Sequence, residues 1–255
     1  FRRLARDCGL QFVEWLFAAD GYEHNPVWSE GGLSRIRTIV EATGVGVRSL
    51  CADYFMAHPF VRVTQTERLE SARILRELIL RSSRAGIAVV VVPLLEAGEV
   101  LNPTELRDVR EALEGALDIA GERSVTLALE SDLPAPAIAS MADLAPHTAL
   151  GVCYDTGNAA AKGFDVAADL ARLCPLLSVA HLKDRDRRGT SVGLGTGLAD
   201  LSAFFRRAAD LSFRGPLVLE TPRGADSLGS AKANLAFAHA CAATFAASAE
   251  GVSVR

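Results

Sequence analysis

The sequence predicts an α/β protein, a single (β/α)8 TIM barrel over residues 1–255. Three observations support this fold class: short β-rich runs alternate with amphipathic helical stretches, most of these runs are almost continuously apolar, and the chain has 255 residues. Continuous apolar runs are typical of parallel strands that are covered on both faces. Strict alternation fits a doubly wound sheet or a closed barrel, and the length favours the barrel, whose eight units need about 250 residues.

Seven apolar runs are expected to form the parallel strands. They are Leu10–Phe17, Gly46–Asp53, Gly86–Leu94, Ser124–Glu130, Ala149–Asp155, Leu176–Leu182 and Gly215–Glu220. A complete barrel has eight strands, and the chain begins on a helix-like segment, Phe1–Gly9, so we expect the first strand to precede residue 1. A seven-stranded or open barrel is the alternative.

Helix patterns fill the intervals between these runs. The clearest are Thr66–Gly86, Pro103–Gly121, Leu198–Gly215 and Ser227–Ser248. Asn102 and Pro103 are a predicted cap and first-turn proline, and Gly86 and Gly121 are predicted helix ends.

Composition and charge exclude several classes of protein. The net charge is −4 without a block of basic residues, so we expect no nucleic-acid or membrane partner. No apolar run approaches the roughly 20 residues of a membrane span. The five cysteines are scattered and none is in a CxxC pair, which indicates free thiols in a reducing, cytoplasmic compartment.

Four residues with metal-binding side chains stand at the ends of the last four expected strands. They are Glu130, Asp155, His181 and Glu220, separated by 25, 26 and 39 residues. Parallel strands end at one face of a barrel, so these side chains should meet there. Three carboxylates in one cavity repel unless a cation neutralises them, and this donor set suits one divalent ion: Mn²⁺, Mg²⁺, Co²⁺ or Zn²⁺.

Each of the four has an ordinary structural explanation when taken alone. Asp155 could cap the next helix, and Glu130 could be a first-turn charge. His181 could be a hydrogen-bonded core histidine, and Glu220 a solvated loop charge. Their recurrence in successive strand–helix units favours a metal site over four independent roles.

The motifs around these residues carry a family resemblance. "LALES", "YDTGN", "AHLKD" and "LVLET" resemble the xylose isomerase-like sugar phosphate isomerase/epimerase superfamily. The resemblance implies a barrel that binds one divalent metal through Glu130, Asp155, His181 and Glu220. In the ketose 3-epimerase branch the two glutamates also form the acid/base pair, which implies catalytic roles for Glu130 and Glu220.

Asn158 departs from two branches of that family. The tagatose/psicose 3-epimerases and the apurinic endonucleases have a histidine there, and its absence argues against a three-metal nuclease. The stretches "DTGN" and "HLKD" look more like pentulose- and hexulose-phosphate epimerases. We therefore expect Asn158 to contact a sugar substrate.

Further substrate-binding candidates are Lys183, Arg187, Asp53 and His58. Lys183 follows His181 by two residues, so it would share the inward face and either bind a substrate anion or pair with Asp184 or Glu220. The resemblance implies a substrate-binding arginine in the next loop, at Arg187 or Arg188. Asp53 ends the run Gly46–Asp53, and His58 lies in the loop after it.

The glycine-rich stretch Gly193–Gly197 follows a long loop rather than a strand. It lacks the flanking elements of a dinucleotide or phosphate loop. We interpret it as shaping the backbone, with anion binding as the lesser option.

The predicted function is a divalent-metal-dependent sugar or sugar-phosphate isomerase/epimerase. It would abstract the proton next to a carbonyl and pass through a cis-enediolate. One alternative is a dehydratase of an inosose- or dehydroshikimate-like cyclic polyol derivative, and another is a non-catalytic carbohydrate-binding barrel. The resemblance also implies a homo-oligomer.

Overall fold

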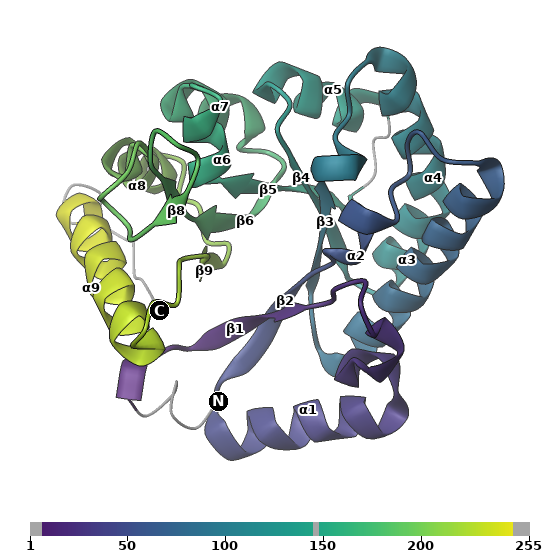
Figure 1. Cartoon of the computed structure of the whole chain (residues 1–255), viewed down its shortest axis with the longest axis horizontal. Coiled ribbons are helices and arrows are strands. Elements are labelled where there is room, and N and C mark those ends of the chain that lie inside the picture. The colour runs from purple at the N-terminus through teal and green to yellow at the C-terminus, as the bar shows by residue number, and fades with distance from the viewer. Residues whose placement is uncertain (1–6, 145–147, 247–255) are drawn as a thin grey trace.

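Seven parallel strands form one curved sheet in the computed structural model, which describes residues 7–144 and 148–246 (Figure 1). The strands are β1 (Phe12–Leu16), β2 (Gly46–Cys51), β3 (Val89–Leu94), β4 (Thr126–Ser131), β5 (Leu150–Asp155), β6 (Leu177–Leu182) and β9 (Leu217–Leu219), in that order across the sheet. Every adjacent pair is parallel, and each strand overlaps one of the seven expected runs. The predicted fold class is confirmed.

Helices surround the sheet on its outer side (Figure 1). They are α1 (Glu30–Thr43), α3 (Gln65–Ala85), α4 (Pro103–Glu122), α5 (Ala135–Leu144), α7 (Val166–Leu173), α8 (Leu201–Asp210) and α9 (Ser227–Ala246). Loops carry the short elements η2 (Tyr22–His24), η3 (Pro26–Trp28), α2 (Tyr54–Ala57), η4 (Glu96–Gly98), α6 (Thr156–Ala161) and the hairpin β7 (Asp184–Arg185) and β8 (Ser191–Val192). Among the helices described, none is long and apolar enough to cross a membrane.

Local sequence explains where helices α3 and α4 begin and where α3 ends. The Asn102 side chain accepts hydrogen bonds from the N–H groups of Thr104 and Glu105 at the start of α4, as expected. Before α3, Thr64 and Glu67 form a capping box, in which each side chain satisfies a backbone N–H of the other. The helix α3 ends at Gly86, whose φ of 77° is in the left-handed region that glycine adopts without strain.

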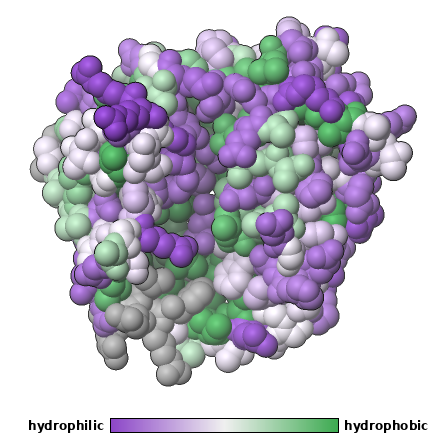
Figure 2. Space-filling view, viewed as in Figure 1, coloured by the Kyte–Doolittle hydropathy of each residue, from purple (hydrophilic) through white to green (hydrophobic). Residues whose placement is uncertain are grey.

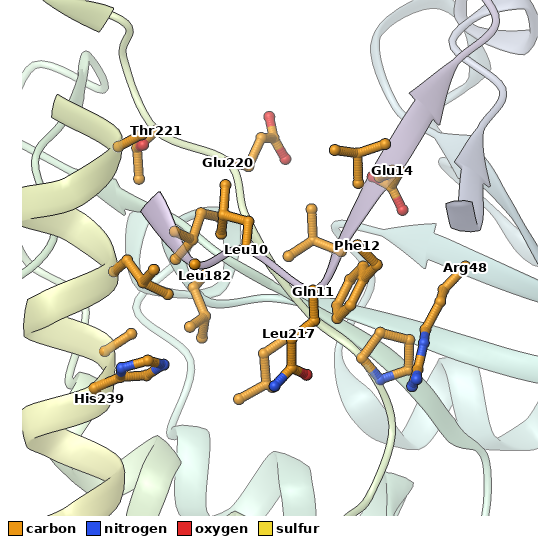
Figure 3. Close-up of a pocket in the computed structure, with 18 of the residues that line it drawn as sticks. Leu10, Gln11, Phe12, Glu14, Arg48, Leu182, Leu217, Glu220, Thr221 and His239 are labelled. Atoms are coloured by element: carbon orange, nitrogen blue, oxygen red, sulfur yellow. The ribbon is translucent and has the colours of Figure 1, made fainter. Parts of the chain in front are cut away.

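The sheet has two edges, β1 and β9, which do not pair with each other in the described part of the chain. A cavity of about 1400 Å³ lies between them, lined by both strands and by α8 and α9 (Figure 3). Figure 2 shows the hollow at the centre of this face. The seven strands therefore leave a space between the two edges of the sheet in the described residues.

Small apolar side chains fill the interior of the barrel below the strand ends. This interior layer consists of Cys51, Val89, Val91, Ala128, Cys153 and Val179, all buried. Larger clusters pack the outer face of the sheet against the helices. The interior layer forms an apolar floor beneath the strand-end residues.

The buried carboxylate of Asp184 organises the loop between β6 and α8. It accepts hydrogen bonds from the N–H groups of Gly195 (3.0 Å), Gly197 (2.8 Å) and Ala199 (2.9 Å). A Cβ atom on Gly197 would lie 2.3 Å from Asp184 Oδ1, so only glycine permits this approach. The glycine-rich stretch 193–197 therefore shapes the backbone around a buried charge.

We expect Asp184→Ala to lower the free energy of unfolding by at least about 3 kcal/mol. The substitution leaves four part-buried N–H groups without their acceptor, those of Arg185, Gly195, Gly197 and Ala199, and an unpaired N–H group costs about 1–3 kcal/mol when it is buried. Urea denaturation measures the loss. The matched control is Asp186→Ala, because Asp186 accepts from Arg188 and Thr190 in an exposed turn where water can replace it. Equal losses for the two variants would contradict this role of Asp184.

Candidate metal centre and active site

The four strand-end side chains converge at the carboxyl ends of the strands. Ligand atoms of Glu130, Asp155, His181 and Glu220 all lie within 4.8 Å of one another. Glu130 and Asp155 are 5% exposed and His181 is 1% exposed, whereas the Glu220 side chain is 44% exposed at the mouth. The structure thus brings together all four side chains that the sequence analysis selected as ligands.

Strand register accounts for this convergence. Asp155 and His181 are directly paired residues of β5 and β6, and His181 is paired in turn with Val218 of β9. Glu130 is the Cα partner of Pro93 near the end of β4. Because the strands are parallel and in near register, residues that close each strand reach the same level of the barrel.

The two carboxylate oxygens of Asp155 have different surroundings. Oδ1 accepts hydrogen bonds from the N–H groups of Gly157 (2.8 Å) and Asn158 (2.9 Å) and so caps α6. Oδ2 is buried without a hydrogen-bond partner and lies 3.4 Å from Lys183 Nζ. The capping role and the cluster role of Asp155 are therefore compatible, one on each oxygen.

His181 lies between carboxylates on both sides of its ring. Its Nε2 is 2.9 Å from Glu14 Oε1, and its Nδ1 is 3.1 Å from Glu220 Oε2 and 3.7 Å from Glu130 Oε2. Neither nitrogen has the geometry of a hydrogen bond, although both are buried. Burial alone would lower the pKa of His181, but the neighbouring Cys153, Glu14 and Glu220 raise it well above its ordinary value.

Glu14 is the site residue that the sequence analysis did not select. It lies on β1 and lines the same cavity as Glu220 (Figure 3). The available signal was a carboxylate inside the apolar run FVEWL, which alternation can turn into the barrel. Its partner His181 is far away in sequence, so only the folded structure shows the contact.

Burial and neighbouring charges together push the pKa values of the two glutamates apart. Burial, reinforced by Asp155 and Glu220, raises the pKa of Glu130 to about 8. Burial would also raise the pKa of Glu220, but contacts with His181 and Lys183 outweigh it and lower the pKa to about 2. One carboxyl group thus favours its neutral form and the other its ionised form.

The donor set fits a divalent cation. Three carboxylates and one imidazole match the oxygen and nitrogen ligands of such ions. Asp155 Oδ2 and both ring nitrogens of His181 are buried polar atoms without hydrogen bonds, which are rare unless another ligand satisfies them. Nearby carboxylates raise each other's pKa, and a bound cation relieves this repulsion.

Lys183 supplies the one ammonium group that contacts the four-residue cluster among the described residues. Its Nζ pairs with Glu220 Oε1 and lies 3.4 Å from Asp155 Oδ2. Burial would lower the pKa of Lys183, but Asp155 and Glu220 raise it. Of the two expected ion-pair partners, the structure selects Glu220.

Asn158 connects the cluster to an arginine. Its Nδ2 donates to Glu130 Oε1 (3.3 Å), and its Oδ1 accepts from Nε (3.1 Å) and Nη2 (2.8 Å) of Arg185. Arg185 also donates to the carbonyl oxygen of Gly189 (2.8 Å). The arginine next to the cluster is therefore Arg185, whereas Arg187 is exposed in the turn between β7 and β8.

Asp53 and His58 follow β2, as expected, but they differ in position. Asp53 is half-buried and accepts a hydrogen bond from Cys51 Sγ (3.2 Å); burial raises its pKa, and Glu220 and Glu14 raise it further. His58 is exposed and stacks on Tyr54 with ring centroids 4.4 Å apart. Asp53 lies within electrostatic range of the cluster, and His58 belongs to the aromatic loop beside it.

We expect Glu130→Gln to change how stability depends on pH when a chelator removes metal ions. The pKa of Glu130 rises from 4.5 to about 8 on folding, so its contribution to stability is present below about pH 4.5 and is lost as pH rises through 8. Relative to the variant, the wild type should lose on the order of 3 kcal/mol between about pH 5 and about pH 9. Urea denaturation at the two pH values measures this difference. Glu122→Gln, at the exposed end of α4, is the control. If the difference in unfolding free energy between wild type and Glu130→Gln is as independent of pH as that for Glu122→Gln, the raised pKa of Glu130 is contradicted.

Curated relatives and solved structures resemble this chain over most of its length. L-ribulose-5-phosphate 3-epimerase UlaE of Salmonella typhi is 27% identical over 228 residues, which are 86% of this chain and 80% of that protein. The structure of an L-ribulose 3-epimerase has a TM-score of 0.79 at 18% identity and covers 98% of this chain and 90% of its own. The similarity to this solved structure shows that the two chains share a fold.

Two of the structural neighbours contain a metal. A xylose isomerase-like TIM barrel protein from Mycobacterium smegmatis, in complex with magnesium, has a TM-score of 0.72 at 18% identity and covers 95% of this chain and 87% of its own. The IOLI protein, with a zinc atom, has a TM-score of 0.76 at 16% identity and covers 98% of this chain and 93% of its own.

The model of the xylose isomerase-like TIM barrel family matches residues 2–241. This chain therefore belongs to the xylose isomerase-like TIM barrel family.

Proposed function

We propose that this protein is a divalent-metal-dependent epimerase or isomerase of a small ketose or its phosphate. The observation that carries the proposal is the convergence of Glu130, Asp155, His181 and Glu220 within 4.8 Å. The family assignment and the 3-epimerase relative support the reaction class.

The four converging side chains would hold the metal ion of the reaction, and Mn²⁺, Mg²⁺, Co²⁺ and Zn²⁺ are the candidates that the sequence leaves open for it. When bound, the ion would polarise the substrate carbonyl as a Lewis acid. Glu14 would hold the ring of His181 through Nε2 and leave Nδ1 directed at the other ligands, because Nδ1 is the nitrogen that faces Glu130 and Glu220.

Glu130 and Glu220 would form the acid/base pair. One carboxylate would remove the proton on the carbon next to the carbonyl, giving a cis-enediolate, and the other would return a proton to that carbon. Their side chains reach one cluster from two different strands, with Glu130 buried and Glu220 open to the mouth. Asn158 would orient Glu130, because its amide is held by Arg185 on one side and donates to Glu130 on the other.

The substrate contacts belong to the same proposal. Lys183 and Asn158 border the cluster and could bind substrate oxygens, and Asp53 could bind a hydroxyl group. Arg187 and His58 are exposed, and in this proposal they would contact a phosphate or the far end of a sugar.

The direct test is proton exchange in D₂O. Metal-loaded protein is incubated with L-ribulose 5-phosphate, free ketoses and cyclic polyols, and deuterium next to the carbonyl is measured by NMR. We expect exchange with at least one ketose, and a fall of at least about 100-fold in Glu220→Gln, because a general base contributes about 10²–10⁴ to the rate. Glu122→Gln is the control, since its side chain is exposed at the end of α4.

Other outcomes would replace the proposal. Loss of water from a cyclic polyol derivative would indicate a dehydratase. Sugar binding without exchange or turnover across the panel would indicate a non-catalytic carbohydrate-binding barrel. Full activity in Glu220→Gln would remove Glu220 from the chemistry.

We also expect Glu14→Ala to weaken metal binding by about 10–100-fold, which is the usual effect of removing the carboxylate behind a metal-binding histidine. Competition with a chelator measures the dissociation constant. Glu23→Ala is the control, because Glu23 is an exposed carboxylate in the neighbouring η2 turn. Unchanged affinity in folded Glu14→Ala protein would show that the ring of His181 is held by other contacts.

A further inference from the structure

A buried thiol lies directly beneath the cluster of four. Cys153 is two residues before Asp155 on β5, so the two side chains point to the same face at successive levels. A carboxylate oxygen of Glu130, the Sγ of Cys153 and a ring nitrogen of His181 all lie within 4.8 Å of one another. All three residues are buried, and neither ring nitrogen of His181 has a hydrogen-bond partner.

This group and the upper cluster share two of their members. Glu130 and His181 belong to both, whereas Cys153 takes the place of Asp155 and Glu220. Glu130 and His181 cannot bind an ion in the upper set and a second ion in the lower set at the same time. The two sets therefore compete for these two ligands. The two sets also differ in chemistry, because the upper set has three carboxylates and the lower set has one carboxylate and one thiol.

Ligand softness separates the ions that the two sets would prefer. Carboxylate oxygens suit Mg²⁺ and Mn²⁺, whereas a thiolate and an imidazole suit Zn²⁺. The interior layer around Cys153 includes Val91, Ala128 and Val179, whose side chains carry no ligand atom for a metal ion. Zinc with one sulfur, one nitrogen and one oxygen ligand has the usual three protein ligands of an open zinc site.

We propose that the barrel contains a second, deeper metal position in which Glu130, Cys153 and His181 bind Zn²⁺. On binding, the S–H bond of Cys153 breaks, its proton leaves to solvent and a sulfur–zinc bond forms, without any change in oxidation state. Mg²⁺ and Mn²⁺ use the upper set. The barrel therefore sorts ions by depth.

Cobalt reports on the sulfur ligand, because a thiolate bound to Co²⁺ gives a charge-transfer absorption in the near ultraviolet. We expect this band in the cobalt-loaded wild type and in Asp155→Asn, which alters only the upper set. It should be absent in Cys153→Ala. The matched control is Cys51→Ala, which removes another buried thiol of the same interior layer and should keep the band.

Affinity gives a second readout. Chelator competition should show that Cys153→Ala weakens Zn²⁺ binding at least about 10-fold and changes Mg²⁺ binding less than about 2-fold, because only the soft ion uses sulfur. Circular dichroism and thermal unfolding establish that each variant is folded. Should Cys153→Ala not fold, X-ray absorption of zinc-loaded wild type decides instead, with one sulfur expected at about 2.3 Å.

The outcomes separate this inference from the proposed function. Cobalt binding without the band, zinc with only oxygen and nitrogen neighbours, or a band that persists in Cys153→Ala overturns the deeper site and leaves the upper cluster intact. A protein that binds neither cobalt nor magnesium overturns both.

Discussion

Repulsion among Glu130, Asp155 and Glu220 is the constraint on which the rest of the site depends. Parallel strands in near register bring these carboxylates to one level, and burial removes the water that would screen two of them. The cluster persists because each carboxylate has a separate compensation. Glu130 favours its neutral form, Asp155 accepts two backbone hydrogen bonds, and Glu220 pairs with Lys183.

The elements around the cluster hold these compensations in place. The carboxylate of Asp184 orders the loop that follows Lys183, and the Thr156 hydroxyl donates to the Lys183 carbonyl oxygen while it accepts from the Lys183 N–H. Gly157 permits close packing here, because a Cβ on it would lie 2.9 Å from the Lys183 side chain. The short segments 155–158 and 181–184 therefore both stabilise the local backbone and carry side chains of the cluster.

Depth within the barrel divides the site into two chemical layers. The upper layer is polar and opens to the mouth through Glu220, and the layer below it consists of Cys, Val and Ala side chains. His181 and Glu130 lie at the boundary, so they can face either oxygen ligands above or sulfur below. Under the proposed deeper site, the choice of metal would depend on position along the barrel axis as well as on ligand type.

The amino-acid sequence by itself determined the seven strands, the main helices, and the four residues that meet at the strand ends. These features depend on local periodicity and on one residue per strand–helix unit, and the regular geometry of parallel strands does the rest. Only the tertiary structure decided the polar partners: Lys183 with Glu220, Arg185 with Asn158 and Glu14 with His181. Such partners are distant in sequence, and side-chain direction, loop path and burial select them only after the strands have assembled.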